Sequence, residues 1–229
     1  MGYAKNAGKK VGRNLAPKVT KMAPDATAAV IHQILDKAIR GVGRLPGAVT
    51  GAEHRLAQYG DAEKAIHAVV ERHVRYAGAQ GFLTNLGGLV TMTVTVPANI
   101  SGLALVECHM VAEIVHLRGY DVDDPRVRSA ILVSLLGEEE VLALIKRKQL
   151  PGTPMEIATS AVHDEALTKV VANEVASALI GRAAGKRLAG VVGRRIPVMG
   201  GVVGASADGF ATWKIGRYVG REFLPRKRR

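Results

Sequence analysis

Apolar residues recur at three- and four-residue steps along most of the chain. Between residues 30 and 42 the aliphatic side chains follow this spacing and the charged side chains fall largely on the opposite side, which predicts an amphipathic helix. The sequence GRLPG ends this helix, because glycine and proline interrupt helical backbone. A second helix is expected to begin at Asp61, whose carboxylate suits the N-cap position. One face of that second helix carries Ala62, Ile66, Val69, Val70 and His73.

Helix-start signals divide the second half of the chain. Asp124 and Thr153 are each followed by a proline, which is favoured at the first helical position, and Glu156 completes a capping box with Thr153. The helix that begins after Thr153 is expected to run to about residue 180, and Pro197 starts a last long apolar segment. Apart from the short run TMTVTV, no stretch alternates apolar and polar residues between turn signals. The pattern therefore predicts an all-α fold.

One long stretch, Tyr76 to Val106, contains no charged side chain. Pro97 is expected to divide it into helical segments at about 81–95 and 97–118. The stretch 81–106 has the roughly 20 residues that span a bilayer, but each of its halves is shorter, and polar residues such as Thr84, Asn85, Asn99 and Ser101 interrupt it. Two arginines and an aspartate interrupt a further apolar segment at 188–213 in the same way. The expectation is helical hairpins buried in a core, and the alternative is hairpins that also dip into lipid.

Glycines mark the two expected hairpins, at 81–118 and 197–221. Because glycine lets helix backbones approach closely, these hairpins are expected to pack tightly and form an apolar core or a lipid-facing groove. The fold class expected is a compact all-helical bundle, with one domain at 24–224, a mobile basic arm at 1–23 and a basic tail at 225–229. The glycines expected to line the groove are Gly87, Gly88, Gly102, Gly200, Gly201 and Gly204.

Charge is polarised along the chain, whose formal net charge is +12 at pH 7. Residues 1–50 hold nine Lys and Arg against two acids, residues 181–229 hold twelve against two, and residues 51–180 hold eleven against sixteen. Basic ends predict contact with an anionic partner, whereas the plainer alternative is a basic surface that only keeps the protein soluble. Nucleic acid is the less favoured partner, because aromatic residues are only 4% of the chain and zinc-finger spacing is absent.

The C-terminal segment combines cations with aromatic residues. Lys214, Arg217 and Arg221 recur at helical steps, and the run PRKRR follows them. Trp213 and two other aromatic residues in this segment suit a helix at a membrane interface, although packing of Trp213 in the core is the plainer alternative. Each cation near an anionic leaflet contributes roughly 1 kcal/mol. The residues expected to bind an anionic surface are Arg217, Arg221, Arg226, Lys227, Arg228 and Arg229.

The best metal-ligating candidates follow Pro97. Glu113 and His116 have the three-residue spacing that carboxylate-bridged di-iron bundles use on each of two helices, but the sequence has no second Glu-x-x-His. His109 can share a helix face with His116, and Glu107 completes the candidate set. No cofactor is expected in the leading interpretation, and Fe, Mn or Zn would be the ion in the alternative. In the plainer alternative, Glu113 and His116 only form a pair at a helix end.

Two longer segments resemble the EcsC protein family. They are GGLVTMTVTVPANISGLALVECHMVAEIVHLRGYDVDDPRVRSAILVSLLG and RRIPVMGGVVGASADGFATWKIGRYVGREF. A Gly-rich apolar segment, a turn like HLRGYD…DPRVR and a C-terminal segment that begins with Ile-Pro occur here in the order that is typical of that family, and the likeness covers roughly residues 60–223. The resemblance implies a helical bacterial protein that is cytoplasmic or peripheral to the membrane. It carries over no catalytic residue and no reaction.

The leading expectation is a non-enzymatic protein at the inner face of a bacterial cell membrane. Its basic ends would bind anionic lipid, and its hairpins would hold a lipid-like apolar molecule or assist a membrane-protein partner. The alternatives are a metal-dependent enzyme that uses Glu113 and His116, and a nucleic-acid accessory protein. The single cysteine, Cys108, fits a reducing compartment, and no secretory signal is expected because no apolar run follows the basic N-terminus. Serine-hydrolase and phosphate-loop signatures both fail, at Ser206 and at 181–187.

Overall fold

A computed structural model describes residues 24–86, 92–192 and 197–227, so the predicted arm at 1–23 lies outside the described residues. Within these ranges every regular element is an α-helix, and the β-type pairing is limited to one isolated bridge between Val42 and Leu45. The all-α prediction is confirmed, but the hairpin expected at 197–221 is wrong, because these residues belong to one continuous helix. The helices are α2 (Pro24–Arg40), α3 (Ala48–Tyr59), α4 (Ala62–Leu86), α5 (Met92–Leu117), α6 (Pro125–Ser134), α7 (Glu138–Lys146), α8 (Pro154–Thr159), α9 (Glu165–Val192) and α10 (Pro197–Glu222).

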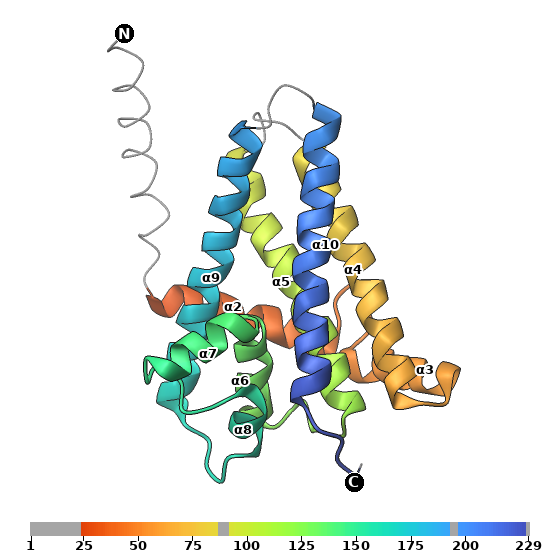
Figure 1. Ribbon diagram of the computed structural model, residues 1–229. Coiled ribbons are helices and arrows are strands. Elements are labelled where there is room, and N and C mark those ends of the chain that lie inside the picture. The colour runs from red at the N-terminus through yellow and green to blue at the C-terminus, as the bar shows by residue number, and fades with distance from the viewer. Residues whose placement is uncertain (1–23, 87–91, 193–196, 228–229) are drawn as a thin grey trace.

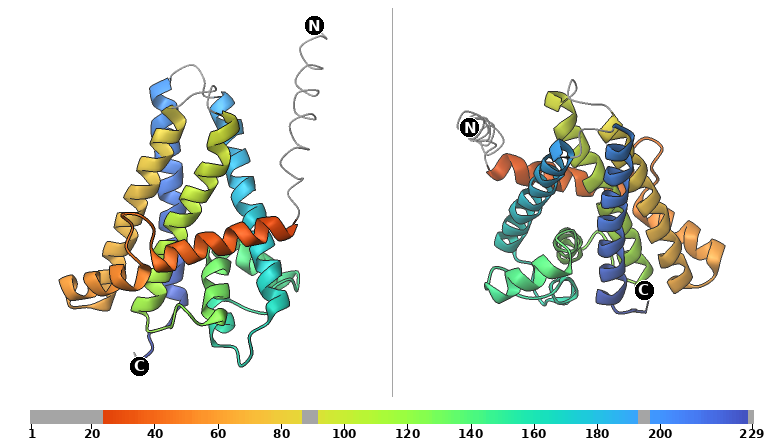
Figure 2. Two further views of the ribbon diagram at one scale, coloured as in Figure 1. Left: turned by 180° about the vertical axis from the view of Figure 1, so that it is seen from behind. Right: turned by 45° about the horizontal axis from the view of Figure 1, so that its top comes forward.

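Four long helices, α4, α5, α9 and α10, stand side by side and extend beyond the other described helices (Figure 1). The shorter helices α3, α6, α7 and α8 gather around their other ends, and α2 crosses the bundle there. Figure 2 shows the same arrangement from behind and from above. We call the far end of the four long helices the projecting end, and the region of the short helices the base.

α5 is the central helix, and it packs against α2, α3, α4 and α10. Its lower half, from Ala104 to Leu117, is almost entirely buried. A helix that is apolar on nearly every side is stable only when other elements surround it. The sequence of α5 therefore dictates its central position, and three polar side chains within it, Glu107, His109 and Glu113, are buried with it.

α4 and α10 have the most extensive contact of any helix pair in the described part of the bundle. A Cβ atom added at Gly216 would lie 2.8 Å from Val70 and 3.2 Å from the Met110 sulfur, so only glycine lets α10 approach this closely. Gly209 also faces Val74, but a Cβ atom there would make an ordinary contact at 3.5 Å. Close packing at helix glycines thus occurs, at positions other than those predicted for the groove.

The prediction that Pro97 divides the uncharged stretch is wrong. α5 begins at Met92 and continues through Pro97, which is its sixth residue. The first four N–H groups of any helix have no partner in the helix, so a proline just beyond them removes a single backbone hydrogen bond. The helix can therefore continue through Pro97 at the cost of one hydrogen bond.

The predicted helix from Thr153 to about residue 180 is also wrong, because the chain forms two helices there. The capping box of Thr153 and Glu156 starts α8 as predicted, but α8 ends at Thr159. Asp164 then accepts hydrogen bonds from two N–H groups in the first turn of α9 and so caps a new helix. The sequence pattern did not predict α3, which lies between the GRLPG turn and Asp61.

Candidate functional site

Four polar side chains meet where α3, α4 and α5 come together near the base. Arg72 and His73 come from α4, and His109 and Glu113 come from α5. The two histidines and the glutamate are buried, whereas the Arg72 side chain is 15% exposed. His109 and Glu113 are one helical turn apart, so their side chains lie on the same face of α5. We call these four residues the polar cluster.

The two histidines of the polar cluster face each other. The distance between His73 Nε2 and His109 Nδ1 is 2.9 Å. The outer nitrogen of each ring meets a backbone carbonyl, because His73 Nδ1 lies 2.8 Å from the Val69 oxygen and His109 Nε2 lies 2.9 Å from the Pro46 oxygen. Both rings are therefore held from behind by the backbone and point toward a common centre.

The carboxylate of the polar cluster accepts hydrogen bonds from Arg72. Arg72 Nη2 lies 2.6 Å from Glu113 Oε1 and 2.5 Å from Glu113 Oε2. Glu113 Oε1 also lies 3.7 Å from His109 Nδ1. α3 passes directly over this carboxylate at Gly51, where an added Cβ atom would overlap Glu113 Oε1. Glycine at this position is what lets the carboxylate lie beneath α3.

Burial shifts the pKa of each ionisable group in the centre of the cluster. It lowers the pKa of His73 to about 3 and that of His109 to about 4, and the backbone carbonyls at Val69 and Pro46 oppose the shift only in part. Burial also raises the pKa of Glu113 to about 7, against the opposing effect of the Arg72 charge. The surroundings therefore favour neutral imidazole rings, which is the form that binds metal ions.

Two of the four predicted metal ligands lie in the polar cluster. His109 and Glu113 are brought together, but the third group is His73, which sequence reasoning did not propose. Among the described residues, His73, His109 and Glu113 form the group of metal-ligating side chains whose ligand atoms lie within 4.8 Å of one another. The sequence did carry a signal for His73, since a histidine on the apolar face of α4 must be buried.

The other two predicted metal ligands point elsewhere. His116 Nε2 lies 2.7 Å from Glu53 Oε1 of α3, so His116 does not form the predicted pair with Glu113. Glu107 is buried on the side of α10, where the Thr212 hydroxyl donates to its Oε1 at 3.3 Å. The predicted set of four is therefore split among three different neighbouring helices.

Two of the predicted cations of α10 bind acidic residues in the base. Arg221 Nη2 donates to Glu138 at 2.7 Å, and Lys214 Nζ donates to Glu139 at 2.8 Å, so both tie α10 to the first turn of α7. The Arg217 guanidinium instead lies 5.8 Å from the centre of the Trp213 ring. Since the Trp213 ring is 45% exposed, it does not pack in the core.

The predicted basic tail begins beside α5 at the base. The backbone N–H of Arg226 donates to the Arg118 carbonyl at 2.8 Å, and its guanidinium lies 5.1 Å from the centre of the Tyr120 ring. Lys227 is exposed. Arg228 and Arg229 lie outside the described residues, so anionic-surface binding by the tail stays a prediction.

The predicted glycine groove falls largely outside what the structure describes. Gly87 and Gly88 are not described, and Gly102 is half-buried on α5. Gly200, Gly201 and Gly204 lie on α10, but the surroundings of these residues are not among those described. The groove therefore stays a prediction.

Three aromatic side chains are exposed where the projecting end begins. Phe210 and Trp213 stack on the surface of α10 with their ring centres 5.8 Å apart, and Tyr76 is exposed on α4. Because Gly209 faces Val74 across the α4–α10 contact, Phe210 and Tyr76 lie at about the same height along the bundle. This height is the lower limit of the uncharged part of both helices.

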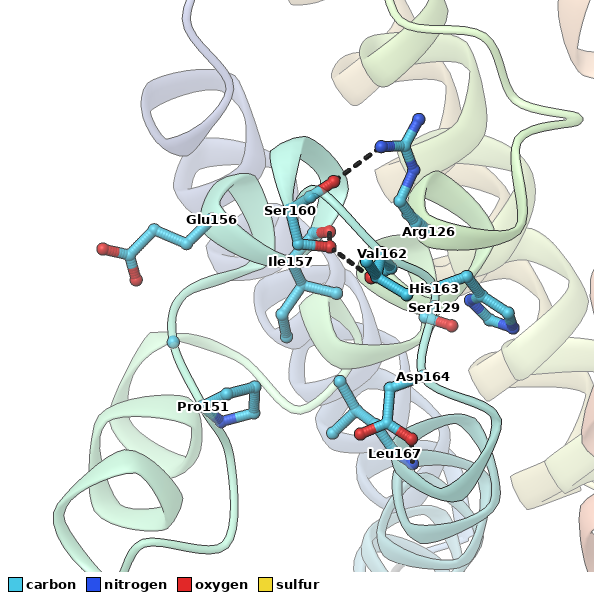
Figure 3. A pocket seen from close by; sticks show the side chains of 11 residues that line it. Arg126, Ser129, Pro151, Glu156, Ile157, Ser160, Val162, His163, Asp164 and Leu167 are labelled. Atoms are coloured by element: carbon cyan, nitrogen blue, oxygen red, sulfur yellow. Dashed lines mark hydrogen bonds between the residues drawn. The ribbon is translucent and has the colours of Figure 1, made fainter.

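A cavity of about 330 Å³ lies in the base between α6, α8 and the start of α9 (Figure 3). Arg126, His163 and Asp164 are among the residues that line it. The charged groups here already have partners, because Arg126 binds Asp124 and the Ser160 carbonyl, and Asp164 caps α9. None of the predicted site residues lines this cavity.

None of the described helices combines the length and the apolar character needed to cross a bilayer. The sequence matches the family model of the EcsC protein family over residues 2–228, a longer range than the resemblance seen in its motifs. No curated protein and no solved structure matches the chain.

Proposed function

The chain belongs to the EcsC protein family, and we propose that it acts at an anionic membrane surface, with its projecting end toward the lipid. One observation carries this proposal: the helix segments of the projecting end contain no acidic residue. These segments are 78–86 of α4, 92–106 of α5, 181–192 of α9 and 197–207 of α10. Their charged residues are Arg182, Lys186 and Arg187, all on α9.

All 20 acidic residues of the chain lie outside these four segments. Segments without acidic residues that are far apart in the sequence thus gather at one end of the molecule, because the long helices bring them there (Figure 1). Each cation near an anionic leaflet contributes about 1 kcal/mol of binding free energy. Three cations give weak binding that salt weakens further, and apolar contact has to supply the rest.

The exposed aromatic residues supply apolar contact at the right height. Tryptophan and tyrosine are enriched at membrane interfaces, where an apolar ring and a polar edge are both satisfied. Phe210 is 61% exposed and Tyr76 is 48% exposed, and Arg217 lies over the Trp213 ring. Together they place aromatic and cationic groups where the uncharged helix segments begin.

The proposal assigns lipid contact to the projecting end and not to the C-terminal tail. The tail starts at the base, at the opposite end of α10 (Figure 1). A flat membrane therefore cannot contact both regions at once. Arg226 and Arg221 also already bind groups in the base.

Vesicle flotation tests the aromatic part of this proposal. We expect the full chain to float with phosphatidylglycerol-containing vesicles at low salt, and to float much less with phosphatidylcholine alone. The variant F210S/W213S should lose most of this binding. The matched control L142S removes a side chain that is 55% exposed on α7, in the base, and should float like the wild type.

Charge reversal tests the electrostatic part. K186E/R187E places two acids on α9 at the projecting end and should abolish flotation, whereas K146E in the last turn of α7 should not. Full binding by both projecting-end variants would overturn the proposal. Loss of binding on truncation after Leu224, with binding intact in F210S/W213S, would assign the contact to the tail instead.

A further inference from the structure

We propose that His73, His109 and Glu113 bind a divalent first-row transition-metal ion between α4 and α5. This inference is independent of the membrane role and uses a different ligand set from the Glu113 and His116 pair expected from the sequence. The three ligand atoms come from two helices, and they lie within 4.8 Å of one another in the buried centre of the polar cluster.

Hydrogen bonding fixes the orientation of both imidazole rings. A backbone carbonyl can only accept, so the ring nitrogen beside it must carry the hydrogen. His73 therefore carries its hydrogen on Nδ1, which meets the Val69 carbonyl, and His109 carries its hydrogen on Nε2, which meets the Pro46 carbonyl. A neutral imidazole has one N–H group, so both inward nitrogens present lone pairs.

Two lone pairs facing each other repel unless a cation lies between them. His73 Nε2 and His109 Nδ1 are 2.9 Å apart, and no N–H group remains on either neutral ring to join them. Two nitrogens bound to one metal ion at about 2.0–2.1 Å each are themselves about 2.8–3.4 Å apart, for bond angles from a right angle to the tetrahedral angle. The observed separation is at the short end of that range.

The outer contacts match those of protein metal sites. A metal-binding histidine nearly always donates its second ring N–H to a carbonyl or carboxylate, which holds the ring in place. Both histidines do so here, through Val69 and Pro46. A ligating carboxylate is normally hydrogen-bonded in turn, and Arg72 donates to both oxygens of Glu113.

The ligand types indicate the class of ion. Two imidazole nitrogens and one carboxylate oxygen suit Zn²⁺, Fe²⁺ or Mn²⁺, whereas Ca²⁺ and Mg²⁺ prefer sites made of oxygen ligands. Cys108 is adjacent to His109 in sequence but lies outside the three-residue group, so a thiolate site is not formed. Three protein ligands leave coordination positions for water.

Arg72 lies between the ion site and solvent. It is the member of the polar cluster that reaches the surface, and its charge opposes a second cation nearby. Tyr76 lies on the same side, with its ring edge against His73 at 5.9 Å between centres. An ion that enters here has to displace the Arg72 side chain, so we expect slow loading of the folded protein.

Zinc titration of the full chain tests the site. The protein is dialysed against EDTA and then titrated with Zn²⁺ by calorimetry, and Co²⁺ binding is followed by visible absorption. We expect one ion per chain, and binding weaker by at least about tenfold in H73Q, H109Q and E113Q. H67Q is the matched control, because His67 is an exposed histidine on the same helix.

Circular dichroism establishes that each variant folds. If a histidine variant unfolds, two other measurements test the site: zinc binding by E113Q, and the melting temperature of the wild type with and without zinc. An ion that binds only the folded state must raise that melting temperature. No zinc binding by folded wild type, or equal binding in E113Q and H67Q, would overturn the proposal. If the protein binds no zinc and ¹⁵N NMR shows a proton shared between His73 and His109, then a proton, and not a metal ion, lies between the two nitrogens.

Discussion

His73 Nε2 and His109 Nδ1 lie 2.9 Å apart, although the two residues are 36 positions apart in the sequence. This contact joins α4 to α5 near the base, while the other ends of the same two helices belong to the projecting end. Binding or loss of an ion in the polar cluster would therefore affect the packing of α4 against α5, the two helices that carry most of the uncharged sequence.

Acid should destabilise the metal-free protein. Because the folded-state pKa values of His73 and His109 are lowered to about 3 and about 4, the unfolded chain protonates these two histidines first as pH falls. Glu113 has the opposite effect, since its pKa is raised to about 7 in the folded state, so the comparison with H73Q/H109Q isolates the contribution of the histidines. The stability that the neutral rings contribute is complete above about pH 6.5 and is lost as pH falls toward 4. Melting temperatures in EDTA at pH 7.5 and 5 should differ more for the wild type than for H73Q/H109Q. A melting temperature that falls no more on acidification in the wild type than in H73Q/H109Q would contradict this.

Replacing Arg72 should make the protein depend on metal. R72M leaves the buried Glu113 carboxylate without its partner, which costs about 3 kcal/mol or more in the free energy of unfolding. Zinc should then raise the melting temperature of R72M more than that of the wild type, since the ion replaces the lost charge and no longer competes with the guanidinium. R75M removes an exposed arginine from the same helix and should behave like the wild type. Equal zinc effects in R72M and R75M would count against the site.

Gly51 should tolerate no side chain. In G51A the new Cβ atom would overlap Glu113 Oε1, so α3 or the carboxylate must move, and such overpacking costs about 1–3 kcal/mol. Zinc affinity should fall in the same variant. G181A is the control, because nothing lies within 4 Å of a Cβ atom there and alanine favours a helix by up to about 1 kcal/mol. Urea unfolding measures both effects, and equal changes in the two variants would disprove the close contact.

Two neighbouring glycines at the α4–α10 contact, Gly216 and Gly220, should differ in how well they tolerate alanine. G216A would press a methyl group against Val70 and Met110, with an expected loss of about 1–3 kcal/mol in the free energy of unfolding. G220A meets Ile66 at an ordinary 3.7 Å and should be neutral or stabilising, because alanine has the higher helix propensity. Urea denaturation compares the two variants directly. Similar stability of both would mean that the helices can move apart at little cost.

Local structure was largely predictable because its causes lie within a few residues. Asp124 caps α6 and Thr153 forms a capping box with Glu156, and each contact spans two or three positions. The same short range explains the errors, since a competing cap at Asp164 starts α9 independently of the signal at Thr153. Pro97 was misjudged because a proline this close to the start of a helix removes only one hydrogen bond and does not have to end it.

Taken alone, the sequence determined that this protein is helical, that helices begin after Asp61, Asp124 and Thr153 and at Pro197, and that acids are absent from the segments that form the projecting end. It also placed His73 on an apolar face and His109 near Glu113. Only the tertiary structure decided that His73 meets His109, and that Glu113 binds Arg72 while His116 binds Glu53. The physical reason is that periodicity fixes which face of a helix is buried, whereas a side chain's partner depends on which other helix covers that face and at what height.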